Sequence, residues 1–87
     1  MALYFLSYDL RKQRDYQKLY DELNSFKAVS VLESLWCFKR VNTSAKELSI
    51  YFRTFVDSDD GLIVTECTNW ASFKANGTPN DLNIETL

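Results

Sequence analysis

The chain has 87 residues and a formal net charge of −2 at neutral pH, which disfavours a protein covered in the positive charge of a broad nucleic-acid binder. It contains no histidine, so Ser-His-Asp and Cys-His catalysis and an ordinary zinc site are excluded. This length predicts one domain. Its two cysteines lie in apolar runs and are expected to be reduced. No export signal or apolar stretch of about 20 residues is present, so we expect a cytoplasmic protein without membrane contact.

Residues 3–9 (LYFLSYD) predict the first strand, because both of their alternating sets of side chains are apolar, as in a central strand covered on both faces. Residues 15–26 predict a helix whose N-cap is Asp15. Its apolar stripe has helical spacing and consists of Tyr16, Leu19, Tyr20 and Leu23.

Residues 28–41 are β-branched and aromatic, without glycine or proline, and are too many for a typical strand. We therefore predict a hairpin of strands 28–32 and 34–41 that turns near Glu33.

Residues 44–56 predict a second helix, because Ser44-Ala-Lys-Glu47 has the form of a capping box before an apolar stripe. Residues 57–61 (DSDDG) are interpreted as a turn, since they lack the loop length and distal glutamate of an EF-hand. Residues 61–67 predict the last strand.

The resulting β-α-β-β-α-β order predicts a ferredoxin-like α+β fold. Such a fold has a four-stranded antiparallel sheet with two helices on one face. We expect this domain to span residues 1–74, with residues 68–74 as an optional fifth strand. The polar tail at 75–87 is expected to be weakly ordered.

The sheet face without helices is expected to be apolar, because the first and third strands carry large apolar residues on both alternating sets. Exposed patches of this kind usually mark an interface. We therefore predict a homodimer with its two sheets face to face, with residues 68–74 adding a strand to the partner. The alternative is that the C-terminal segment folds back over its own sheet.

The first strand ends in Tyr8-Asp9, and basic residues follow before the first helix. With the predicted topology, these features resemble the CRISPR-associated Cas-two family. The chain is still more similar to small bacterial and phage proteins described as SinR-like, which share SYDL, a segment like Leu32-Glu33-Ser34-Leu35-Trp36 and one like Thr68-Asn69-Trp70-Ala71. The resemblance covers about residues 3–73. It implies a small dimeric protein that is either a metal-dependent endonuclease or the structural partner of a spacer-acquisition integrase.

The resemblance makes Asp9 the candidate catalytic and metal-binding residue. A two-fold dimer with Asp9 near its axis would supply two carboxylates, enough to hold a hydrated Mg²⁺. Ser7 and Tyr8 are accessory candidates. The alternative is that Asp9 starts a loop or pairs with Arg11 or Arg14.

Residues 9–18 contain four basic residues but only two carboxylates, Asp9 and Asp15. The basic residues are candidates for contacting nucleic-acid phosphates: Arg11, Lys12, Arg14 and Lys18. A solvated loop and helix face is the alternative. Three functions therefore compete: a Mg²⁺-dependent endonuclease acting on RNA or DNA, a catalytically silent dimeric scaffold that binds nucleic acid or a protein partner in a CRISPR system, and a phage or mobile-element protein that uses the fold only for protein interaction.

Overall fold

A computed structural model describes residues 1–12 and 15–82. Four strands and two helices alternate in the predicted order, and two short 3₁₀ helices are added. Their bounds are β1 (Ala2–Asp9), α1 (Gln17–Ser25), β2 (Val29–Leu32), β3 (Leu35–Arg40), α2 (Ala45–Phe52), η1 (Arg53–Phe55), β4 (Gly61–Cys67) and η2 (Pro79–Asp81). Each predicted strand and helix is present. The second helix was predicted to be longer, and its final turn is the 3₁₀ helix η1.

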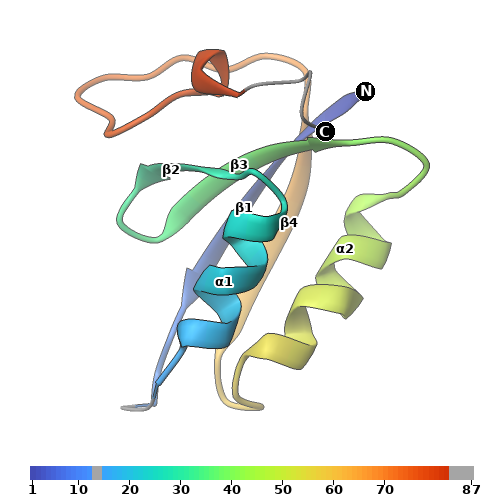
Figure 1. Cartoon of the computed structure of the whole chain (residues 1–87), viewed down its shortest axis with the longest axis vertical. Coiled ribbons are helices and arrows are strands. Elements are labelled where there is room, and N and C mark those ends of the chain that lie inside the picture. Colours follow the sequence, from blue (N-terminus) through green and yellow to red (C-terminus); the bar gives the residue numbers. More distant parts are fainter. Residues whose placement is uncertain (13–14, 83–87) are drawn as a thin grey trace.

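The four strands form one sheet in the order β2-β3-β1-β4, and every neighbouring pair is antiparallel (Figure 1). β1 is hydrogen-bonded to a neighbour on each side, as the predicted central strand requires. The prediction of an α+β fold with a four-stranded antiparallel sheet and two helices is confirmed. No described residue after Cys67 belongs to a strand. The addition of residues 68–74 to a partner's sheet stays a prediction.

Both helices pack on the same face of the sheet. From β1, the alternating residues Tyr4, Leu6 and Tyr8 are buried in this layer. The other buried members of the same cluster come from α1, β3, α2 and β4: Leu19, Leu23, Phe38, Leu48, Phe52 and Val64. Within the described residues, no helix is long and apolar enough to cross a bilayer.

Local signals fix the helix starts and the hairpin. The Ser44 side chain accepts a hydrogen bond from the Glu47 amide at 3.1 Å, as the predicted capping box requires. The Asp15 carboxylate accepts one from the Gln17 amide at 2.9 Å, although the geometric N-cap is Tyr16, one residue later than predicted. The turn between β2 and β3 is the predicted tight one, at residues 33–34.

The opposite face of the sheet, called the open face below, carries the other alternating set of residues. The strand register places these residues on it: Leu3, Phe5, Ser7 and Asp9 of β1, Leu35 and Cys37 of β3, and Ile63, Thr65 and Cys67 of β4. In Figure 1 the segment after β4, drawn from orange to red, crosses the side of β2 and β3 opposite α1.

Residues 76–82 contact β2 directly. The Asn76 amide donates to the Val31 carbonyl at 2.8 Å, and both Gly77 and Pro79 are buried. The alternative of a C-terminal segment folding over its own sheet is therefore what the structure shows for this segment. The expected weak order of the tail stays a prediction, and residues 83–87 lie outside the described part of the chain.

Candidate functional site

Asp9 ends β1 and lies opposite Gly61, the first residue of β4. Its side chain is exposed, and its carboxylate Oδ2 is 3.1 Å from the Arg11 Nε, which donates a hydrogen bond to it. The structure thus places Asp9 at the strand end, as predicted, and shows the Arg11 pairing that the sequence left as an alternative.

Arg11 joins the segment after β1 to the turn before β4. Its amide donates to Asp60 Oδ1 at 2.7 Å, and its Nη1 donates to the Asp59 carbonyl at 3.0 Å. The guanidinium also lies over Gly61, where an added Cβ would be 3.0 Å from Nη2. Beside it, the Lys12 Nζ lies 2.9 Å from Asp59 Oδ2. We call these contacts, from Asp9, Arg11 and Lys12 to Asp59 and Asp60, the charged brace.

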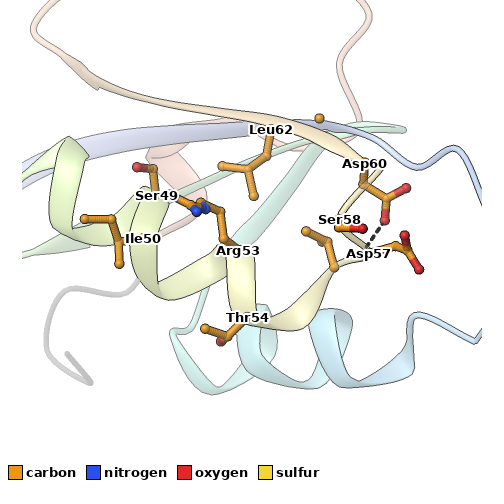
Figure 2. A pocket seen from close by; sticks show the side chains of 10 residues that line it. Ser49, Ile50, Arg53, Thr54, Asp57, Ser58, Asp60 and Leu62 are labelled. Carbon is orange, nitrogen blue, oxygen red and sulfur yellow. Dashed lines mark hydrogen bonds between the residues drawn. The ribbon is translucent and has the colours of Figure 1, made fainter.

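Asp60 organises the turn itself. Its Oδ2 accepts from the Tyr16 hydroxyl and from the Asp57 amide, both at 2.7 Å (Figure 2 shows Asp57 and Asp60 joined). The turn closes through an Asp60 amide to Asp57 carbonyl bond of 3.0 Å. Residues 57–61 are therefore a turn, as predicted. The contact of this turn with Arg11 and Lys12, the basic segment after β1, was not predicted. The predicted topology contained the signal for it, because antiparallel pairing of β1 and β4 puts the end of one strand beside the start of the other.

Of the remaining candidates, Tyr8 and Lys18 lie apart from the Asp9 carboxylate. Tyr8 points into the helix-covered layer, where its hydroxyl accepts from Trp36 Nε1 at 3.2 Å and donates to the Glu33 carbonyl at 3.4 Å. Burial raises the pKa of Tyr8 above its ordinary value. Ser7 shares the open face with Asp9, and Lys18 is exposed on α1. Arg14 lies outside the described residues.

Asp9 is the one sequence-predicted magnesium ligand, and the described residues around it can be checked for further ligands. In the part of the chain that the structure describes, no three histidine, cysteine, aspartate or glutamate side chains converge as metal ligands. Asp9 contributes one carboxylate, and a guanidinium already occupies one of its oxygens. Mg²⁺ requires near-octahedral oxygen ligands and is usually held by one or two carboxylates. From this motif a single chain offers only the Asp9 carboxylate, which is paired with the Arg11 guanidinium.

Charges within the brace compensate one another. The Asp9–Arg11 pair has side chains 71% and 57% exposed, and the Asp59–Lys12 pair 62% and 50%. Exposed pairs of this kind contribute only about 0–1 kcal/mol and are screened by salt. A phosphate would have to compete with carboxylates for both cations, which lowers the affinity expected from the basic residues alone.

A hollow of about 870 Å³ lies on the other side of the turn, between the end of α2 and the start of β4. Figure 2 shows that Arg53, Ser49 and Ile50 line it from the helix, while Asp57 and Asp60 line it from the turn. The lining thus holds one cation, Arg53, whose nitrogens point toward Ser49 in Figure 2, and two carboxylates of a tightly bonded turn. Nothing in the sequence predicted this hollow, and its mixed lining indicates no particular ligand.

No protein-family model matches the chain, and no solved structure matches it significantly.

Proposed function

We propose that the chain is a ferredoxin-like, Cas-two-like protein that works as a dimeric binding scaffold without a catalytic step of its own. The β-α-β-β-α-β order and the β2-β3-β1-β4 sheet support the ferredoxin-like assignment. The observation that carries the scaffold role is the charged brace, because it gives the candidate catalytic residue a structural partner.

Asp9 and Arg11 act together as a tie between two loops. Arg11 reaches the Asp9 carboxylate, the Asp59 carbonyl and the Asp60 carboxylate at once. By orienting the Arg11 guanidinium, the Asp9 carboxylate holds the end of β1 in place. This structural role explains why an aspartate stands at the end of the strand without a catalytic function. This use leaves the open face as the surface available for a partner.

The β1–β4 half of the open face carries exposed apolar surface among its polar residues. Ile63 is 59% exposed, and Leu3 and Phe5 beside it are only partly buried. Contiguous apolar surface on a chain this small favours association. A second copy of the chain is the partner we propose, with the two open faces in contact.

Sedimentation velocity over a concentration series tests this dimer. We expect dimers at high micromolar concentration, and we expect Ile63→Asp to shift the protein to monomer, because it places a charge in the proposed interface. Ile50→Asp is the matched control, since Ile50 is 50% exposed but lies on α2, away from the open face. A monomer at every concentration, or equal effects of the two substitutions, would refute the proposed interface.

Nucleic acid is a second partner that the scaffold would bind through the basic segment. Replacing Arg11, Lys12 and Arg14 together by alanine should then weaken binding and reduce its salt dependence. An unchanged salt slope would remove this segment from the interface. Because the cations are paired with carboxylates, we expect weak binding that salt abolishes readily.

A metal-dependent endonuclease is the second candidate function, and one observation favours it. Asp9 is exposed at a rigid strand end on the open face, so a face-to-face dimer with its axis near this end would bring two such carboxylates together. Asp9→Asn should then abolish Mg²⁺-dependent cleavage without changing the dimer. Asp59→Asn, in the neighbouring ion pair, is the control and should retain activity. Cleavage that survives Asp9→Asn would end this candidate.

A further inference from the structure

Residues 76–82, called the strap below, close over the β2 edge of the open face. An added Cβ at Gly77 would lie 2.6 Å from Val29 Cγ1 and 2.8 Å from the Ser30 carbonyl oxygen. Contacts this close leave no room for a side chain, so the strap backbone lies directly on β2. Pro79 is buried next to Gly77, and Val31 of β2 is only 5% exposed.

Cys37 shows how far the cover extends. It lies on the open face, opposite Phe5 of β1 and Val29 of β2, yet it is fully buried. Burial raises the pKa of its thiol to about 11, and the nearby charge of Asp81 acts in the same direction. Asp81 belongs to the strap. The strap therefore covers the β2–β3 half of the open face. In the β1–β4 half, Ile63 stays exposed, while Phe5 and Cys67 line a hollow together with residues of the segment that leads to the strap.

The covered half matters for association because it takes area away from the open face. A standard stable interface buries roughly 800 Å² of accessible surface per partner. With the strap seated on β2, a second copy has only the remainder of the open face to contact.

The strap keeps its shape by bonds within itself more than by bonds to the sheet. Thr78 and Asp81 form a reciprocal capping box around η2, with the Thr78 amide donating to Asp81 Oδ2 at 2.9 Å. Within the described residues, a single backbone hydrogen bond, from Asn76 to Val31, joins it to the sheet. A unit that is bonded internally and only lightly to its support can leave as a body.

We propose that the strap is an intramolecular competitor of the dimer, which occupies the β2–β3 half of the open face and must be released before a second copy can use the whole face. This inference rests on the proposed self-association. It makes the intact chain a weak dimer and the released chain a tight one.

Gly77→Val in the full chain tests the inference, because the valine side chain cannot fit against Val29 and Ser30. Asn80→Val is the matched control, since Asn80 is exposed on the same strap. Both are made with Cys67→Ser, so that Cys37 is the only thiol left to label. We expect Gly77→Val to speed labelling of Cys37 at least tenfold and to lower the dimer Kd at least tenfold, with neither change in Asn80→Val.

Two results overturn the inference while leaving the dimer in place. One is faster labelling with an unchanged Kd, and the other is unchanged labelling in a folded Gly77→Val protein. If far-UV circular dichroism shows that this variant is unfolded, Pro79→Asp, which charges a buried strap position without adding bulk at β2, is judged by the same criteria. Failure of every variant and of the wild type to associate refutes the proposed dimer itself, and the inference with it.

Discussion

Asp60 connects three parts of the chain through one carboxylate. It accepts hydrogen bonds from the Arg11 amide, the Tyr16 hydroxyl and the Asp57 amide, each at 2.7 Å. Asp60→Ala would leave these three donors without that acceptor. Two of them are backbone or hydroxyl groups in partly buried positions, where unmet hydrogen-bonding capacity lowers stability.

The expected loss follows from these contacts. A hydrogen bond to a charged group contributes about 1.5–3 kcal/mol, and partial exposure lets water replace some of each bond. We therefore expect Asp60→Ala to lower the free energy of unfolding by about 2–4 kcal/mol, a large share of the roughly 4–13 kcal/mol usual for a chain of this size.

Urea unfolding followed by far-UV circular dichroism measures this loss. Asp59→Ala is the control, because the Asp59 side chain makes an exposed ion pair with Lys12 and should contribute below about 1 kcal/mol. The m-value should be unchanged in both variants. Ordinary surface substitutions change the free energy of unfolding by up to about 0.5 kcal/mol. If the losses caused by Asp60→Ala and Asp59→Ala differ by less than this, Asp60 does not organise the charged brace.

Three further predictions concern the core, a helix start and pH. Phe52 is fully buried between the helices and the sheet, so Phe52→Ala should cost about 3–5 kcal/mol in urea unfolding, and a loss below about 1 kcal/mol would contradict its place in the core. Ser44→Ala should cost about 1 kcal/mol, seen as a lower Tm, whereas Ser44→Asp should retain most of the stability. The folded pKa of Cys37 is about 11 against an ordinary 9.0, so its contribution is complete below pH 9.0 and is lost as the pH rises to about 11. Stability should therefore fall less steeply over this range in Cys37→Ala, and equal slopes would show that the thiol does not titrate there.

Much of the fold could be predicted because the deciding signals are local. The apolarity of both alternating sets in residues 3–9 indicates a central strand, and β1 has a hydrogen-bonded neighbour on each side. Residues 28–41 exceed the length of one strand, which requires the turn at residues 33–34. The Ser44 N-cap, which the capping-box pattern predicts, fixes the start of α2 to within one residue.

The charged brace and the strap could not be predicted in the same way. Arg11 and Asp60 lie 49 residues apart, and their contact depends on the register between β1 and β4. The strap is polar in sequence, and its composition resembles that of an unpacked tail. The strap lies close to β2 because Gly77 has no side chain to keep the two backbones apart, and because the Asn76 amide donates a hydrogen bond to Val31. Neither feature produces a hydrophobic pattern in the sequence.

The two halves of the open face have different roles in association. The β1–β4 half exposes Ile63 in the intact chain and ends at Asp9, whereas the segment that leads to the strap leaves β4 at Cys67, opposite Leu3 at the other end of β1. Ile63→Asp should therefore remove the weak dimer of the intact chain, which has only this half to use. In a Gly77→Val background the β2–β3 half becomes available, so the same substitution should weaken the dimer without abolishing it. If Ile63→Asp gave a monomer equally in both backgrounds, the β2–β3 half would add nothing to the interface, and the strap would serve only to shield Val31 and Cys37 from water.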